Sequence, residues 1–145
     1  MRMPEPTDRF IYLLGMLFDR YRERVYARLA DAGHSAVRPA HSAIFRGIHV
    51  DGSRMVDLAA RAGITKQSIA YLVADLEKSG YLPIGPDPHD RRARLVMLSD
   101  KGLEVHHLLP TISRAVETEA AQELGLADLE DTKDLLRRLL ERTSR

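Results

Sequence analysis

The feature that most constrains the fold is the segment 57–80, which reads DLAARAGITKQSIAYLVADLEKSG. Leu58 and Ala59 fit the inner face of a short helix, and Gly63 fits a turn because a left-handed backbone conformation is accessible without a β-carbon. After this turn, apolar residues recur at the i, i+3, i+4 and i+7 spacing of one helix face, at Ile69, Leu72, Val73 and Leu76. Two short amphipathic helices joined by a glycine turn predict a helix-turn-helix.

The opposite face of the second helix is polar and suits contacts with a nucleic acid. Its members are Thr65, Lys66, Gln67, Ser68 and Tyr71. In a helix-turn-helix the N-terminal part of the second helix enters the major groove. There Gln67 can pair bidentately with adenine, and Lys66 can reach guanine or a phosphate. A helix pair with a merely solvated outer face would show the same pattern, so this segment alone leaves both interpretations open.

Directly after this helix, residues 81–98 change to strand and turn character. The turn-rich run GPDPHD is followed by RRARLVML, which predicts a β-hairpin with a charged tip. An arginine at such a tip can enter the minor groove, where narrow A·T-rich stretches have a strong negative potential. The tip supplies Arg91, Arg92 and Arg94. Asp90 lies two residues before Arg92, on the same side of an extended chain, where its carboxylate can hold that arginine. A solubilising surface turn is the alternative, but the position behind a helix-turn-helix favours a DNA-binding wing.

The residues before this hairpin predict helices through their caps and apolar repeats. A helix over 8–31 carries an apolar stripe too wide for one packing surface, which indicates a second subunit as one candidate partner. Pro39 suits the first position of a helix over 39–50. Ser53 and Thr65 suit the N-caps of the two helices of the helix-turn-helix, the first of which is expected to end at the glycine turn. Strand is therefore expected in the hairpin alone.

The hairpin and the C-terminal part complete the expected architecture. Pro83 cannot donate a ladder hydrogen bond, so the first strand of the hairpin is expected to be short or to lie at an edge. Ser99 suits the N-cap of a fifth helix, which Pro110 is expected to kink or interrupt. A final helix over about 126–142 is rich in leucine. Helices, one hairpin and further helices predict an α+β fold that is mostly α.

Composition excludes several classes of function. The 145 residues include no cysteine, which removes disulfides, thiolate catalysis and cysteine-bound zinc. No Gly-rich phosphate loop, nucleophile elbow or evident carboxylate pair points to an enzyme. The apolar runs are too short for a transmembrane helix and the N-terminus lacks a secretory signal, so a cytoplasmic location without a membrane partner is expected. The net charge is only +1, and residues 61–94 hold six Lys and Arg against four Asp and Glu, which predicts ordinary, salt-sensitive DNA affinity.

The combined motif spacing resembles that of the MarR family of bacterial and archaeal winged helix-turn-helix regulators. The resemblance is carried by MVDLAARAGITKQSIAYLVADLEKSGYL and DPHDRRARLVMLSDKG. Its fixed points are Leu58–Ala59, Gly63, Leu76 to Gly80, Asp90 to Arg92, and Leu98–Ser99 to Gly102. Tyr71 departs from the pattern, because many members carry arginine there. The resemblance implies one MarR-like chain over 1–145, with a winged helix-turn-helix core at 36–98 and helical dimerisation regions at 8–31 and 103–143.

The same resemblance implies a homodimer that binds a pseudo-palindromic operator in double-stranded DNA, usually as a repressor released by a small ligand. Carried over by position, Thr65 to Ser68 and Tyr71 meet the major groove, and Arg92 enters the minor groove with Asp90 bracing it. The implied dimer interface includes residues of the first and last helices, namely Phe10, Leu14, Leu17, Leu135, Leu136 and Leu139.

Ligands and partners leave alternatives open. Arg38, His41 and Arg46 lie near the region where relatives bind effectors, so a small anionic or aromatic ligand is one expectation and ordinary surface groups are the other. Glu23, His41 and His107 resemble part of the zinc site of some members, although solvated or capping histidines fit better, and no metal or cofactor is expected. The alternative function is a winged-helix module that binds proteins without touching DNA.

Overall fold

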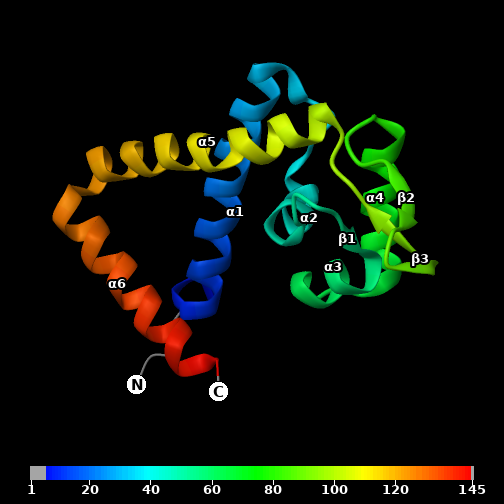
Figure 1. Ribbon diagram of the computed structural model, residues 1–145. Coiled ribbons are helices and arrows are strands. Elements are labelled where there is room, and N and C mark those ends of the chain that lie inside the picture. The colour runs from blue at the N-terminus through cyan, green and yellow to red at the C-terminus, as the bar shows by residue number, and fades with distance from the viewer. Residues whose placement is uncertain (1–5, 145) are drawn as a thin grey trace.

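The computed structural model describes residues 6–144 and places long helices on one side of the molecule and a smaller winged module on the other (Figure 1). The helices are α1 Phe10–Leu29, α2 Ser42–Gly47, α3 Met55–Ala62, α4 Lys66–Lys78, α5 Asp100–Leu124 and α6 Leu126–Thr143. Shorter helical turns are η1 Pro6–Asp8, η2 Ala30–His34 and η3 Pro39–His41. The strands are β1 Ser53–Arg54, β2 Ile84–Asp87 and β3 Asp90–Val96. The predicted fold class, α+β and mostly α, is confirmed.

Helices α3 and α4 form the predicted helix-turn-helix. Gly63 ends α3 with a left-handed φ of 66°, the conformation for which glycine is suited. The Thr65 hydroxyl caps α4 by accepting a hydrogen bond from the Ser68 N–H at 3.1 Å. The apolar residues expected on the inner faces are buried, namely Leu58, Ala59, Ile69, Val73 and Leu76. This packing leaves the polar face of α4 on the outside.

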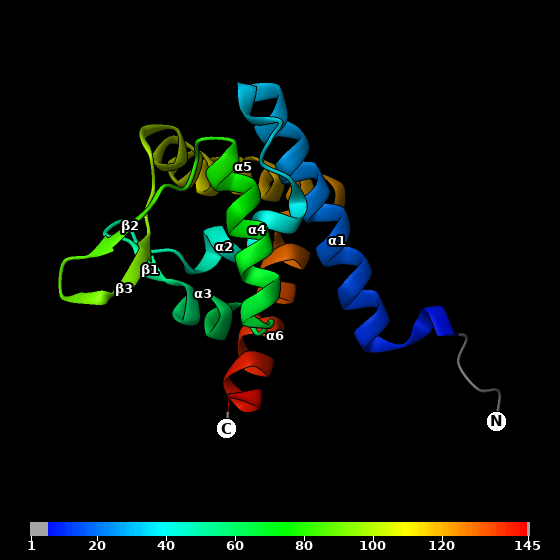
Figure 2. The ribbon, with the colours of Figure 1, turned by 90° about the vertical axis from the view of Figure 1, so that its right-hand side faces the viewer.

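The predicted hairpin forms β2 and β3, which belong to a three-stranded antiparallel sheet in the order β1-β3-β2. The strand β2 has four residues and lies at the edge, as Pro83 just before it indicated. Pro86 lies inside β2 opposite Arg94, and an edge strand accommodates proline because one of its sides makes no ladder hydrogen bonds. The hairpin projects from the module as its most protruding part (Figure 2).

The strand β1 shows that the prediction of a Ser53 cap is wrong. Ser53 pairs with Val96 in the sheet, and α3 begins only at Met55 with Arg54 as its N-cap. The Ser53 hydroxyl instead accepts a hydrogen bond from the His49 N–H at 3.0 Å. A strand of two residues forms because β3 offers it an open edge, and so short a strand has no alternating pattern of its own.

Two further helical expectations need adjustment. The helix expected over 39–50 is a 3-10 turn followed by α2, which ends at Gly47. Helix α5 runs through Pro110 without interruption. Proline removes one helix hydrogen bond, but Val105 and Val116 are buried on either side of it, so packing holds both halves of α5 in place.

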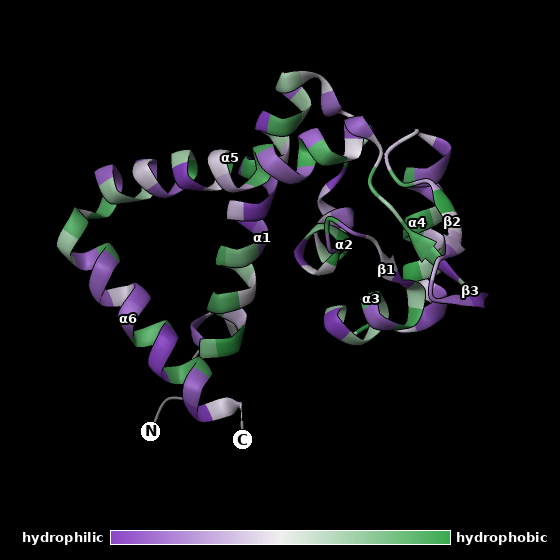
Figure 3. Ribbon diagram, viewed as in Figure 1, coloured by the Kyte–Doolittle hydropathy of each residue, from purple (hydrophilic) through white to green (hydrophobic). Residues whose placement is uncertain are grey.

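The outer helices leave large apolar side chains uncovered in the single chain. These side chains are Phe10, Ile11, Tyr12, Leu13, Leu17 and Phe18 on α1, and Leu126, Leu135, Leu136, Leu139 and Leu140 on α6. Helix α6 buries none of its residues, and green apolar turns mark both helices in Figure 3. Exposed large apolar side chains gathered on two helices are typical of an interaction site. Within residues 6–144, no helix is long and apolar enough to cross a membrane.

Candidate nucleic-acid interface

The N-terminal half of α4 presents the polar face that the sequence predicted. Thr65, Lys66, Gln67, Ser68 and Tyr71 are all exposed. The Thr65 and Ser68 hydroxyls are hydrogen-bonded to each other at 2.8 Å. Within the described residues, the side chains of Lys66, Gln67 and Tyr71 make no hydrogen bond or ion pair. Tyr71 is 73% exposed, so its ring contributes little to the core. The face therefore offers donors and acceptors that the folded chain does not itself use.

The cap of α4 allows a direct test of local stability. Thr65→Ala removes the hydroxyl that accepts the Ser68 N–H and is expected to lower the free energy of unfolding by about 1 kcal/mol. Urea denaturation measures this change. Thr65→Ser is the matched control, because it keeps the hydroxyl acceptor and is expected to unfold near the wild-type midpoint. Equal stability of Thr65→Ala and wild type would show that the cap does not stabilise the helix.

The wing carries its three arginines at or beside the tip. Arg91, Arg92 and Arg94 are exposed, and Asp90 is half-buried at the start of β3. The Asp90 carboxylate accepts a hydrogen bond from the backbone N–H of Arg92 at 3.0 Å. Asp90 therefore holds Arg92 through its main chain, and the structure shows no bond from Asp90 to the Arg92 guanidinium within the described residues. The guanidinium of Arg92 extends from this ordered turn.

An ion pair links β1 to the tip end of β2, and the sequence alone does not reveal it. Arg54 Nη2 lies 2.8 Å from Asp87 Oδ2, and Arg54 Nε donates to the same oxygen at 2.9 Å. Asp87 is buried, and the pKa of its carboxyl is lowered first by the hydrogen bond from the His89 N–H and then by Arg54. The pair joins β1 to the end of β2, so it ties the wing to the helix-turn-helix. No local pattern signals it, because the two residues are far apart in the sequence.

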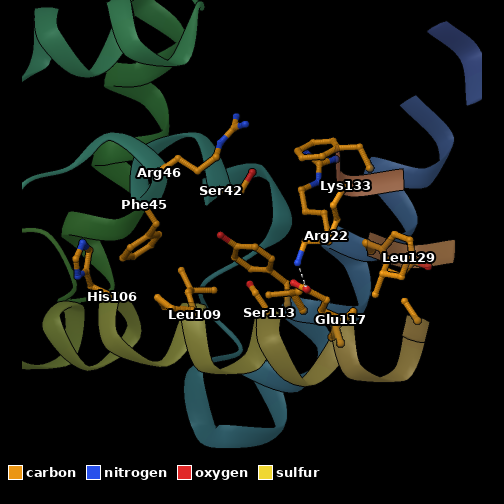
Figure 4. A pocket seen from close by; sticks show the side chains of 17 residues that line it. Arg22, Ser42, Phe45, Arg46, His106, Leu109, Ser113, Glu117, Leu129 and Lys133 are labelled. Carbon is orange, nitrogen blue, oxygen red and sulfur yellow. Dashed lines mark hydrogen bonds and ion pairs between the residues drawn. The ribbon is translucent and has the colours of Figure 1, made fainter. Parts of the chain in front are cut away.

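A cavity of about 580 Å³ opens between the long helices and α2 (Figure 4). Its walls combine aromatic rings with a few polar groups. Residues that line it include Phe18, Tyr21, Arg22, Tyr26, Phe45, Arg46, His106, Leu109, Ser113, Glu117, Leu129 and Lys133. Burial raises the pKa of Tyr26 to about 12, which keeps its phenol neutral. Mostly apolar cavities of this size with a few polar groups are typical of small-molecule sites.

Two polar atoms in the cavity wall are buried and have no hydrogen-bond partner within the described part of the chain. They are Nε of Arg22 and Nδ1 of His106. Buried polar groups are rarely left unsatisfied, because desolvation without a hydrogen bond is unfavourable. The guanidinium of Arg46 lies 5.6 Å from the ring centre of Phe18 in the same wall. The cavity thus offers aromatic surface together with unused hydrogen-bonding capacity.

The residues expected near an effector do not all reach this cavity. Arg46 lines it, whereas Arg38 and His41 are bonded to Asp75 of α4. Glu23 and His107 are exposed, and within residues 6–144 no three His, Cys, Asp or Glu side chains are grouped closely enough to hold a metal ion. Arg46 is therefore the one member of the expected effector group that faces the cavity.

Comparison with known proteins finds a family match over most of the winged module. Residues 37–93 match the MarR family, and the fold superposes on the crystal structure of MarR itself with a TM-score of 0.73 at 25% identity, over 92% of this chain and 96% of that one. The chain belongs to the MarR family. This family consists of winged helix-turn-helix transcription regulators and not of enzymes, so the resemblance seen in the sequence is confirmed.

Two other similar proteins, BadR and CouR, show the range of similarity. The transcriptional activatory protein BadR of Rhodopseudomonas palustris is 30% identical over 105 residues, which are 71% of this chain and 59% of BadR. The chain thus spans about three fifths of the length of this curated relative. The repressor CouR, solved on a 23-mer DNA duplex, is 23% identical with a TM-score of 0.72, over 100% of this chain and 99% of CouR. CouR from Rhodococcus jostii RHA1 has also been solved with p-coumaroyl-CoA, at 19% identity and a TM-score of 0.70, over 94% of this chain and 95% of CouR.

Proposed function

We propose that this protein is a transcription regulator that binds a pseudo-palindromic operator as a homodimer and responds to a small ligand. The observation that carries the proposal is the combination, in one module, of an unused polar face on α4 with an arginine wing whose turn is held by a hydrogen bond. In this proposal the module spans 36–98, and Lys66, Gln67 and Tyr71 meet the major groove. Arg92 enters the adjacent minor groove, where the negative potential attracts arginine. That CouR was solved on a DNA duplex supports the proposal.

The homodimer is the second part of the proposal. The uncovered apolar side chains of α1 and α6 lie within the regions 8–31 and 103–143 and offer apolar surface that a second copy could cover. A single wing with a small local excess of positive charge would bind DNA weakly, whereas two linked modules bind far more tightly because the second contact is intramolecular. The half-sites are expected about one helical turn apart, as in other helix-turn-helix dimers.

A gel-shift titration tests DNA binding by the wild-type protein. The probe is the DNA that flanks its own gene, with an unrelated duplex of the same length as competitor. The proposal predicts a complex that resists this competitor and weakens as salt rises, because phosphate contacts release counterions. A complex that the competitor displaces equally well, or no complex at all, would contradict DNA recognition and favour a protein-binding winged helix.

Gln67 is expected to read one base pair in each half-site. Gln67→Ala should reduce discrimination at that position by about 1–3 kcal/mol while other positions keep their preference. Competition with a panel of singly substituted operators measures this change. Lys66→Ala is the comparison variant, and if Lys66 contacts phosphate its loss should weaken binding evenly across the panel. An even loss for Gln67→Ala as well would contradict its assignment as a base-reading residue.

The ligand is proposed to occupy the cavity between α1, α2, α5 and α6. The aromatic wall and the free polar atoms of Arg22 and His106 suit an aromatic ring bearing an anionic or hydrogen-bonding group. Relatives with the same fold were solved with p-coumaroyl-CoA and studied with 6-hydroxynicotinic acid, which supports this class. We infer repression by operator occupancy, with release on ligand binding. Transcription from the operator in the presence and absence of the protein distinguishes this from activation, the activity named for BadR.

A thermal-shift screen of small aromatic acids and aromatic acyl thioesters tests the cavity. A compound that binds the folded protein raises its Tm in proportion to the logarithm of ligand concentration. We expect Arg46→Ala to reduce that shift, because the guanidinium faces the cavity beside the ring of Phe18. Arg20→Ala removes an arginine outside the cavity wall and is expected to leave the shift unchanged. Equal shifts in wild type and Arg46→Ala would place the ligand elsewhere.

A further inference from the structure

A cluster of polar side chains connects the recognition helix α4 to the turn that precedes α2. Arg38 Nη2 donates a hydrogen bond to Asp75 Oδ2 at 2.6 Å, and Nε2 of His41 lies 2.9 Å from the same oxygen. Arg38 is the N-cap of η3 and His41 is its last residue, so both groups come from one short turn. One carboxylate oxygen of α4 is therefore held from two directions by a single segment.

The ring of His41 is a rigid point of attachment. Its Nδ1 accepts the backbone N–H of Arg38 at 2.9 Å, so the ring proton is on Nε2 and is donated to Asp75. The side chain is fully buried, and this burial lowers the pKa of His41, which favours the neutral ring that the pattern requires. The pKa of Asp75 is also lowered, chiefly by the hydrogen bond from Arg38, so the carboxylate is charged.

Directional bonds are significant here because the buried face of α4 is apolar. Ile69, Val73 and Leu76 pack into the core, and apolar packing is non-directional, so it resists small rotations of a helix only weakly. Charge-assisted hydrogen bonds set both distance and direction. Asp75 follows Tyr71 by one helical turn, so its attachment determines how the exposed face of α4 is rotated.

The geometry points to Arg38 and His41 as positioning residues that act through Asp75 and hold the recognition helix in the orientation that operator binding needs. This inference rests on the proposed DNA-binding function and adds residues beyond the exposed face of α4. The same turn continues directly into α2, which lines the cavity through Ser42, Phe45 and Arg46. The cluster therefore joins the recognition helix to the segment that leads into the cavity wall.

Charge and positioning predict opposite results for one member of this cluster. Asp75→Ala removes a negative charge, so electrostatics alone predicts tighter binding to the DNA polyanion. Positioning predicts weaker operator binding, because α4 loses its attachment. Both explanations predict weaker operator binding for Arg38→Ala. If Arg38 acts by positioning α4 through Asp75, however, adding Arg38→Ala to Asp75→Ala should cause no further loss of affinity. Arg38 is 57% exposed, and pairs this exposed contribute little to stability, so the fold is expected to survive its loss.

The test measures operator affinity by fluorescence anisotropy and Tm by circular dichroism at one salt concentration. Asp75→Ala and Arg38→Ala are each expected to weaken operator binding about tenfold. The double variant is expected to bind no more weakly than the weaker-binding of the two single variants. Arg38→Lys is expected to restore part of the loss. Glu77→Ala is the matched control, since Glu77 is an exposed acid on the same helix and makes no side-chain ion pair within residues 6–144.

The outcomes separate this inference from the proposed function. If Asp75→Ala binds the operator as tightly as Glu77→Ala, or if the two losses multiply in the double variant, the positioning role is overturned while DNA binding stands. If Asp75→Ala melts below the assay temperature, the two Arg38 variants decide the question. Arg38→Ala and Arg38→Lys that both bind the operator as tightly as wild type would also overturn the positioning role. Failure of the wild-type protein to form a specific complex overturns both.

Discussion

Replacement of Arg92 by alanine is expected to weaken operator binding about a hundredfold, because each contact of this kind contributes about 1–3 kcal/mol and a dimer carries two wings. Tm is expected to stay within about 2 °C of the wild-type value, since Arg92 is exposed and the turn is held by its backbone N–H, which alanine keeps. Fluorescence anisotropy on the operator and a thermal melt measure the two quantities.

The control for Arg92 is Arg114→Ala, which removes the same charge from α5, away from the wing. It is expected to change operator affinity by less than about twofold, because exposed charges beyond a Debye length are largely screened. A similar loss in both variants would mean that Arg92 acts only through net charge. A large fall in Tm for Arg92→Ala would mean that the residue is structural.

A single charge in the apolar surface of α6 is expected to separate the dimer. Leu139 is 42% exposed in the single chain, and Leu139→Asp would bury a carboxylate in the proposed interface, which is strongly unfavourable without a partner. The variant should sediment as a monomer at micromolar concentration. Its operator affinity should fall by at least about a hundredfold, because the two modules are no longer linked.

Val50→Asp is the matched control for this dimer test. Val50 is 57% exposed and lies in the loop between α2 and β1, outside the outer helices. The Val50→Asp variant should remain dimeric in analytical ultracentrifugation. If Leu139→Asp also remains dimeric and binds the operator as wild type does, the apolar surface of α6 is not the subunit interface.

The winged module could be predicted because its signals are local. Thr65 caps α4, Gly63 makes the turn, and the inner face of α4 follows the helical period, so each step depends on residues a few positions apart. The hairpin was similarly evident from its turn-rich run at 85–90 and the strand-like segment that follows it. The family pattern of Asp90 and Arg92 then placed the wing behind the recognition helix, and the structure bears out that arrangement.

The contacts that position the module are long-range, and the sequence did not reveal them. Strand β1 forms only because β3 pairs with it, and no local pattern indicates this pairing. The local sequence therefore predicts a helix cap at Ser53. The pairs Arg54–Asp87 and Arg38–Asp75 join residues more than thirty positions apart. The resemblance offers His41 as one candidate effector residue beside the alternative of an ordinary polar group, whereas the fold buries it against Asp75.

Hydroxyl-radical footprinting of the wild-type protein and of Arg92→Ala on the operator tests the central claim most directly. Two recognition helices and two wings predict protection that is symmetric about the operator centre, with half-sites about one helical turn apart. The outermost protected minor-groove positions should reappear in Arg92→Ala while the inner protection remains, at protein concentrations that saturate both complexes. A single asymmetric footprint, or a footprint that is identical in both proteins, would contradict the proposed placement of α4 and the wing on DNA.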